Sequence, residues 1–146
     1  MRYFNVYGLG QSYGPYSGVI TKFIDRLMGG ELPVIHGDGE QTRDFVEISD
    51  IVNANMLALE RTGVPSEPIN IGTGTATSIK DLANLLIDIT GRKRLKPAFD
   101  QPRTGDIRHS CADITKARRV LGYEPKIPLR EGLVKLFKDY GESFHR

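Results

Sequence analysis

Apolar residues recur every three or four positions in five segments of the chain, a spacing that predicts amphipathic helices. The segments cover residues 19–28, 49–63, 78–91, 113–122 and 129–140. Ser17 stands before the first segment, Ser78 begins the third and Asp113 begins the fourth, and all three side chains are suited to capping a helix. We therefore expect about five helices.

Short apolar runs lie between these helical segments and are typical of strands. They occur at residues 3–7, 32–36, 44–48 and 68–71. Because helices and strands alternate, we expect an α/β to α+β architecture, and 146 residues fit one domain with one hydrophobic core. The first run is apolar and leads into a glycine-rich turn. A strand of this kind usually has neighbours on both sides, so the sequence resembles part of a larger fold.

Composition and charge exclude several classes of protein. With 39% hydrophobic and 26% charged residues the chain is typical of a soluble globular protein, and its net charge of +2 gives no electrostatic case for binding nucleic acid. No apolar run approaches the roughly 20 residues that span a membrane, and the first residues do not resemble a signal peptide. We expect a cytoplasmic protein that binds neither nucleic acid nor membrane.

A search for catalytic machinery finds none in this sequence. Cys111 is the only cysteine, which rules out an intrachain disulfide, and the histidines show no metal-ligand spacing, so no metal is expected. Glycine-rich turns begin at Gly8, Gly37 and Gly72, but none has the spacing and setting of a dinucleotide-binding loop. No tyrosine is followed by a lysine four residues later. We therefore assign no catalytic residue.

Four segments, in order, resemble the extended short-chain dehydrogenase/reductase family of NAD-dependent epimerases and dehydratases, and within it UDP-glucose 4-epimerases. They are residues 2–8 (RYFNVYG), 37–46 (GDGEQTRDFV), 70–79 and 102–123. Each segment alone is a weak signal, but together they cover nearly the whole chain. The resemblance is to the carboxy-terminal half of such an enzyme.

This resemblance implies a division of labour between two halves. The amino-terminal half of these enzymes is a Rossmann domain that binds NAD and carries a serine and a tyrosine–lysine pair. The carboxy-terminal half holds the nucleoside diphosphate of the sugar substrate. Residues 1–146 are then one nucleotide-sugar-binding domain, with one residual Rossmann strand and short sheets packed by about five helices. Such a chain is not expected to bind NAD or to catalyse a reaction alone.

The resemblance also implies roles for individual residues. Those beside the nicotinamide are Tyr3 and Phe4. Those that hold the substrate are Asn5, whose amide donates to the diphosphate; Val34, Ile35 and His36, which frame the uracil largely through backbone groups; Arg43 and Arg103, which clamp phosphate oxygens; and Asp106, which accepts a ribose hydroxyl.

The chemistry of these residue types agrees with the implied roles, although each has a plainer interpretation. Guanidinium groups bind phosphate oxygens with two parallel hydrogen bonds and keep their charge, and a carboxylate accepts from a sugar diol. Alternatively, Arg43 forms a local surface ion pair with Asp44, Arg103 and Asp106 form a loop salt bridge, and Asn5 is a turn former at a strand end. The substrate-binding interpretation requires Arg43 and Arg103 to face one hollow.

Two departures from the family pattern affect the substrate prediction. Leu9 and Gly10 stand where the family commonly has Pro-Arg, which removes a cation near the substrate cleft, and Glu47 stands where an aromatic residue is frequent. The resemblance therefore favours the UDP-sugar-binding part of a UDP-glucose/galactose 4-epimerase. A nucleotide-sugar dehydratase or decarboxylase fragment and a non-catalytic nucleotide-binding or interaction module stay open as alternatives.

The expected partners follow from the missing half. The ligand would be UDP or a UDP-sugar. Because the residual strand would leave apolar surface and an unpaired edge, we expect the chain to self-associate through residues 3–7 or to pair with a complementary Rossmann half.

Overall fold

The computed structural model describes residues 1–11, 14, 17–92 and 94–143. Five helices occur in these residues, as the periodicity predicts. They are α1 (Val19–Met28), α2 (Ile48–Glu60), α3 (Ile79–Ile89), α4 (Thr115–Leu121) and α5 (Leu129–Ser143).

Local hydrogen bonds fix where the helices begin, and they agree only in part with the predicted caps. Ser78 caps α3 as expected, since its hydroxyl accepts from the Asp81 backbone N–H at 2.9 Å. Helix α2 begins before the predicted Ser49 because the Glu47 carboxylate accepts from the Ser49 N–H at 2.6 Å. The prediction that Ser17 caps α1 is wrong. The N-cap residue is Gly18, which has no side chain to accept a hydrogen bond.

The strands are short and pair in twos. They are β1 (Arg2–Tyr3), β2 (Asn5–Tyr7), β3 (Val34–His36), β4 (Thr42–Arg43), β5 (Phe45–Glu47), β6 (Asn70–Ile71), β7 (Thr77–Ser78) and β8 (Ala98–Asp100). The pairs β1–β6, β2–β5 and β3–β8 are parallel, and β4–β7 is antiparallel.

The predicted single strand at residues 3–7 is divided in the structure. Its first part, β1, pairs with β6, and its second part, β2, pairs with β5. The change of partner falls at Phe4, whose N–H donates to the Ile71 carbonyl, while the next N–H, of Asn5, donates to the Asp44 carbonyl. A hydrophobic run shows that a strand is present but carries no information about a change of partner within it.

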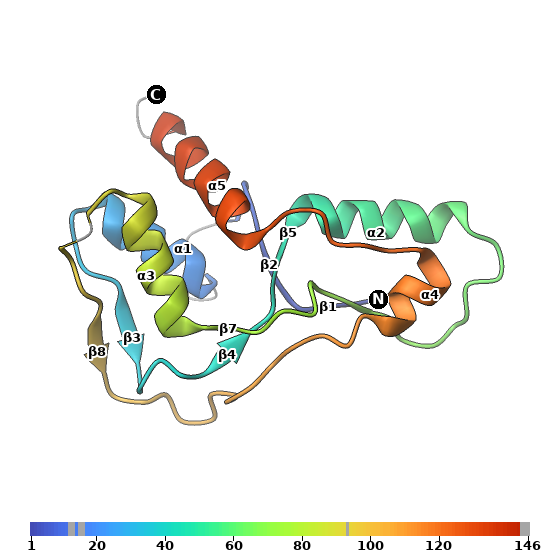
Figure 1. The fold of residues 1–146 in the computed structure, drawn as a ribbon, viewed down its shortest axis with the longest axis horizontal. Helices are drawn as coiled ribbons and strands as arrows, with labels where there is room; N and C mark the ends of the chain where they lie inside the picture. The colour runs from blue at the N-terminus through green and yellow to red at the C-terminus, as the bar shows by residue number, and fades with distance from the viewer. Residues whose placement is uncertain (12–13, 15–16, 93, 144–146) are drawn as a thin grey trace.

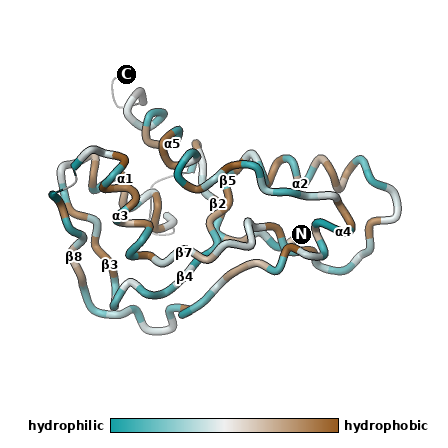
Figure 2. The backbone as a smooth tube through the Cα atoms, viewed as in Figure 1, coloured by the Kyte–Doolittle hydropathy of each residue, from teal (hydrophilic) through white to brown (hydrophobic). Residues whose placement is uncertain are grey.

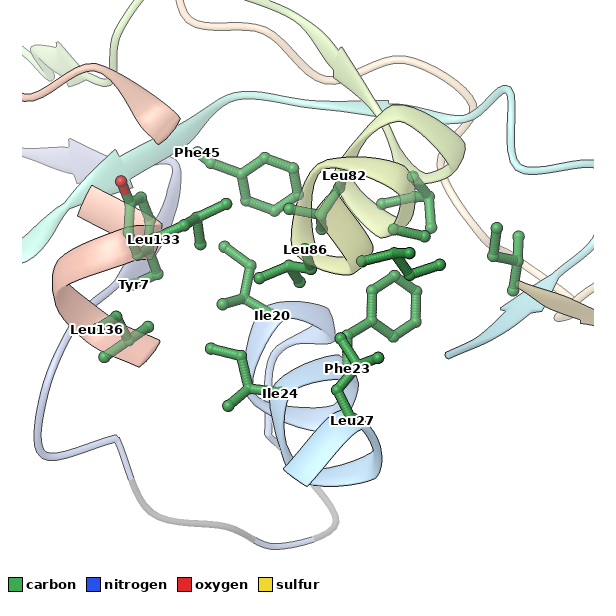
Figure 3. Close-up of a cluster of buried hydrophobic side chains, with 14 residues drawn as sticks. Tyr7, Ile20, Phe23, Ile24, Leu27, Phe45, Leu82, Leu86, Leu133 and Leu136 are labelled. Atoms are coloured by element: carbon green, nitrogen blue, oxygen red, sulfur yellow. The ribbon is translucent and has the colours of Figure 1, made fainter. Parts of the chain in front are cut away.

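Apolar side chains form two clusters rather than the single core expected from chain length. Figure 1 shows the arrangement of the helices and strands that carry them. One cluster lies among α1, α3 and α5, where Ile24, Leu86 and Leu133 are fully buried (Figure 3). The other joins α2 and α4 to β6. The strand pairs β2–β5 and β4–β7 lie between the two ends of the molecule (Figure 1).

The buried carboxylate of Asp44 connects three segments that are distant in sequence. It accepts hydrogen bonds from the Thr73 N–H at 2.8 Å, the Thr73 hydroxyl at 2.6 Å, the Gly74 N–H at 2.9 Å and the Ala112 N–H at 3.1 Å. Asp44 is 0% exposed, so these donors from the described residues take the place of water around its carboxylate. The residue holds the segment after β6 and the segment before α4 against the β4–β5 junction.

Candidate functional site

A cavity of about 520 Å³ opens between α1, β3, β4 and the segment that follows β8. Six of the seven side chains predicted to hold a nucleotide sugar line it, although they come from four separate segments. These six are Asn5, Val34, His36, Arg43, Arg103 and Asp106. The two arginines therefore face one hollow, which is the arrangement that the substrate-binding interpretation requires.

Strand β3 supplies one wall of the cavity through the alternation of its side chains. Val34 and His36 line the cavity, whereas Ile35, on the opposite face of the strand, is 0% exposed in the hydrophobic core. The structure therefore does not bring the Ile35 side chain to the site. The His36 ring nitrogen Nδ1 lies 3.3 Å from the Gln101 carbonyl, which directs the ring toward the segment after β8.

Arg43 is held in place by three acceptors. Its guanidinium forms an ion pair with Asp106 and donates to the Ile107 carbonyl at 2.6 Å and to the Thr42 carbonyl at 2.7 Å. The side chain is only 15% exposed, so this arginine is pre-organised on the cavity wall. The alternative of a local Arg43–Asp44 ion pair is wrong, because Asp44 is buried against backbone N–H groups instead.

Arg103 differs from Arg43 in exposure and in the number of groups that hold its side chain. It is exposed, it lines the same cavity, and no hydrogen bond or ion pair holds its side chain within residues 1–11, 14, 17–92 and 94–143. The alternative of a loop salt bridge between Arg103 and Asp106 is also wrong, because Asp106 pairs with Arg43. The turn is stabilised by its backbone, where the Asp106 N–H donates to the Arg103 carbonyl at 3.2 Å.

Helix α1 contributes two further cations that the sequence analysis did not identify. Lys22 and Arg26 are one helical turn apart and both line the cavity. Arg26 is engaged with Glu31 at 2.9 Å and with the Leu32 carbonyl at 2.6 Å. In the sequence both residues fall on the polar side of an amphipathic helix. Solvated cations are ordinary at such positions, so this pattern did not mark the two residues as part of a site. Four cationic side chains and the carboxylates of Asp100 and Asp106 thus line the cavity.

Gln41 is a second residue that the sequence analysis missed. It is 8% exposed, and its amide nitrogen donates to the His36 carbonyl at 2.8 Å and lies 3.4 Å from an Asp106 oxygen. The amide therefore links the end of β3 to the carboxylate that holds Arg43. No sequence signal distinguished this glutamine from the polar residues of an ordinary turn.

Asn5 opens β2 at the edge of the cavity. Its side-chain amide donates to the Asp44 carbonyl at 3.3 Å, which fixes the side chain toward the β4–β5 junction. An amide nitrogen carries two N–H groups, so one donor stays available for a ligand.

The sequence of the chain matches the NAD dependent epimerase/dehydratase family over residues 1–72. It is 39% identical over 134 residues to the UDP-glucose 4-epimerase of Mycolicibacterium smegmatis, a match that covers 90% of this chain and 41% of that protein. The first 72 residues thus match the NAD-dependent epimerase/dehydratase family, and nearly the whole chain is similar to the carboxy-terminal part of its members. The chain is also 32% identical over 147 residues to the UDP-N-acetyl-alpha-D-glucosaminuronate decarboxylase of Bacillus cytotoxicus, which covers 97% of this chain and 46% of the relative.

The fold is that of solved members of the same family. The UDP-glucose 4-epimerase of Thermotoga maritima, crystallised with UDP-glucose, superposes with a TM-score of 0.91 at 44% sequence identity. That superposition covers 98% of this chain and 45% of the epimerase. The chain thus has the α/β structure of part of an extended short-chain dehydrogenase and spans less than half the length of the relatives it matches.

Tyr3 and Phe4, the two residues predicted to lie beside a nicotinamide, are outside the cavity. Tyr3 is exposed beside helix α2, where its hydroxyl donates to the Asn55 side chain at 2.9 Å. Phe4 packs against the cluster that joins α2, α4 and β6. If these two residues contact a cofactor, as predicted, they do so at a surface other than the cavity.

Among the described residues, the glycine-rich turn after β3 lacks the setting of a dinucleotide-binding loop. The turn after β3, with Gly37 and Gly39, leads into strand β4, whereas a dinucleotide pyrophosphate binds where a glycine-rich turn opens a helix. In the described part of the chain no group of three histidine, cysteine or acidic residues could hold a metal ion. Nor is any helix of that part long and apolar enough to cross a membrane.

Proposed function

We propose that this chain is the nucleotide-sugar-binding portion of an NAD-dependent UDP-sugar 4-epimerase and that its cavity holds the UDP moiety. The observation that supports this most is the meeting of Arg43 and Arg103 in one cavity, with the Asn5 amide beside them. The similarity to UDP-glucose 4-epimerases over nearly the whole chain supports the choice of ligand.

The cavity offers different chemistry to each part of UDP. Arg43 is held by three acceptors and Arg103 is an exposed cation on the same cavity, so two guanidinium groups can bind one diphosphate together. Val34 and His36 on β3 would frame the base. Asp106 has acceptor lone pairs beyond the ion pair with Arg43, which suits a ribose hydroxyl.

In this proposal the chain anchors the substrate and does not break bonds. NAD, held by a complementary Rossmann half, supplies reversible hydride transfer at the sugar. Arg43, Arg103 and Asn5 keep the diphosphate fixed while the sugar reacts, so binding energy far from the reacting carbon positions it.

The same anchor is suited to related reactions. Relatives of this chain include a decarboxylase as well as 4-epimerases. In this proposal the cavity residues would contact the nucleotide rather than the reacting sugar. A dehydratase or decarboxylase portion is therefore the alternative enzyme. A non-catalytic nucleotide-binding module is the alternative without a Rossmann partner.

Calorimetric titration of the purified chain with UDP tests the proposal. We expect saturable binding below millimolar UDP, and we expect R103A to weaken it roughly tenfold, about 1.4 kcal/mol, because a charge-assisted contact is lost. R103K should recover only part of the affinity, since an ammonium cannot form the two parallel hydrogen bonds of a guanidinium. Arg103 is exposed, so these changes leave the fold intact.

Arg130→Ala is the matched control for this experiment. Arg130 is also an exposed arginine, but it lies on α5 in an ion pair with Asp88 and does not line the cavity. R130A should bind UDP as the unmodified chain does. A folded chain that ignores millimolar UDP, or one in which R103A and R130A behave alike, would contradict the proposal.

A further inference from the structure

Gln41 lies at a position where an amide side chain is unfavourable for stability. It lines the cavity and is 8% exposed, yet its carbonyl oxygen Oε1 is buried without a hydrogen-bond partner among the described residues. A buried polar atom without a partner loses the hydrogen bonds that it would make in water. An apolar side chain of similar length would avoid this loss, so stability alone does not account for the amide.

The amide nitrogen of Gln41 is directed at two acceptors. It donates to the His36 carbonyl at 2.8 Å and lies 3.4 Å from the Asp106 oxygen Oδ2. Exchanging the oxygen and the nitrogen of the amide would direct an acceptor at both groups, so these two neighbours fix its orientation. Gln41 therefore offers a donor to the carboxylate that the proposed function assigns to the ribose.

Gln41 and Arg43 together hold the two oxygens of this carboxylate. They flank Thr42 at the start of β4, where successive side chains point to opposite faces, and the Thr42 hydroxyl lies 3.1 Å from His109 Nδ1 instead. Arg43 pairs with Oδ1 of Asp106, and the Gln41 amide faces Oδ2. Each oxygen of the carboxylate thus has a donor from this segment.

Asp106 depends on these donors because its own segment, residues 101–109, is exposed. The segment lies beside β4, since the Thr42 N–H donates to the Arg108 carbonyl at 2.8 Å, and Figure 2 shows both as mainly hydrophilic. An aspartate on an exposed segment populates several rotamers unless other groups fix it. The Asp106 side chain is 35% exposed and lines the cavity, so it can still accept from a ligand there.

We propose that Gln41 is a positioning residue that sets the preference of the site for ribonucleotides over 2′-deoxyribonucleotides. This inference rests on the proposed function, in which Asp106 accepts a ribose hydroxyl. A carboxylate held at both oxygens presents its free lone pairs in one orientation, which suits the two neighbouring hydroxyls of ribose. A 2′-deoxyribose lacks one of these hydroxyls, so the fixed acceptor is left without a donor.

Calorimetric titration with UDP and with 2′-deoxy-UDP tests the proposal, because the two probes share the base and the diphosphate. We expect the unmodified chain to bind UDP about tenfold more tightly than 2′-deoxy-UDP, a modest factor because Asp106 is partly exposed. Q41M has a side chain of similar length without a donor. It should weaken UDP binding about fivefold and 2′-deoxy-UDP binding less than about twofold, so that the preference falls to about twofold.

Gln11→Met is the matched control. Gln11 is also a partly buried glutamine, and its side-chain oxygen accepts from the Thr21 hydroxyl at 2.8 Å, but it does not line the cavity. Q11M should keep the full preference for UDP.

A double variant separates positioning from a purely structural role. D106A should remove the preference, and Q41M/D106A should bind both nucleotides as D106A does, because Gln41 acts through the carboxylate. A purely structural role at the end of β3 would instead weaken both nucleotides equally and would persist in the double variant. If circular dichroism shows that Q41M does not fold, Q41N takes its place, since asparagine keeps an amide but is one methylene shorter and withdraws the donor.

Equal weakening of the two nucleotides by Q41M, or a tenfold preference that survives the substitution, would overturn this inference. So would an unmodified chain that binds both nucleotides equally well. In each of these cases the chain still binds UDP, and the proposed function stands. An unmodified, folded chain that binds neither nucleotide would contradict the proposed function, and this inference with it.

Discussion

Replacing Asp44 by asparagine is expected to lower the free energy of unfolding by about 3 kcal/mol or more, because it removes a buried charge that accepts four hydrogen bonds. The asparagine keeps one acceptor oxygen and directs an NH₂ group at backbone N–H donors that have no other hydrogen-bond partner among the described residues. Gly72 leaves no room for rearrangement, since a Cβ there would lie 2.7 Å from an Asp44 oxygen. Urea unfolding followed by circular dichroism measures the effect.

Asp113→Asn provides the control for this prediction. Asp113 is also an aspartate that accepts a backbone hydrogen bond, from the Thr115 N–H at 2.9 Å, but it is exposed. Water can replace the lost interaction, so we expect D113N to cost at most about 1 kcal/mol. If D44N were no more destabilising than D113N, the assigned role of Asp44 in joining three segments would be incorrect.

Gly132→Ala is the second change with a large expected effect, a loss of about 2 to 3 kcal/mol from overpacking. Gly132 lies in α5, where alanine would ordinarily strengthen the helix, but its Cβ would collide with the Tyr7 hydroxyl and lie 3.0 Å from the ring carbon Cζ. Tyr7 is fixed in the core beside Leu133 and Leu136 (Figure 3). The ring cannot move away without disturbing that packing.

A double-mutant cycle with Tyr7→Phe tests the cause of this effect. The Tyr7 hydroxyl is buried and has no hydrogen-bond partner within the described residues, so its removal should be nearly neutral and should recover about 1 kcal/mol or more in Y7F/G132A. Burial, followed by the nearby charges of Glu47 and Asp50, also raises the pKa of Tyr7 above its ordinary value.

Gly141→Ala is the control in the same helix. A Cβ at Gly141 meets no atom of the described residues within 4 Å, so the helix propensity of alanine should leave stability unchanged or raise it by about 1 kcal/mol. Thermal or urea unfolding of the four variants compares them directly. Equal effects of G132A and G141A would contradict the predicted collision.

The five helices were predictable because periodic apolar residues and nearby caps act within a few positions of each other. Strands β4, β7 and β8 were not predicted, since they contain two or three residues and are stabilised by partners distant in sequence. The division of residues 3–7 between two strand pairs has the same cause.

The candidate site was also predictable only in part: the sequence indicated residue types but not the contacts between them. The sequence motif singled out Arg43, Arg103 and Asp106 as residue types suited to a nucleotide sugar, and the structure places all three at one cavity. The sequence did not indicate that Arg43 pairs with Asp106 rather than with its neighbour Asp44. Nor did it indicate that Lys22 of α1 lines the cavity. Chain neighbours are poor guides to ion pairs, because successive side chains of a strand point to opposite faces.

By itself the sequence determined the helices, the family resemblance and the identity of the groups that can bind a phosphate, since these depend on local spacing and on side-chain chemistry. Only the tertiary structure decided which of these groups meet and that the buried Asp44 connects distant segments. The physical reason is that burial and pairing depend on contacts between distant segments. An apolar residue at a helical position reads the same in the sequence whether its side chain faces a core, a partner or water.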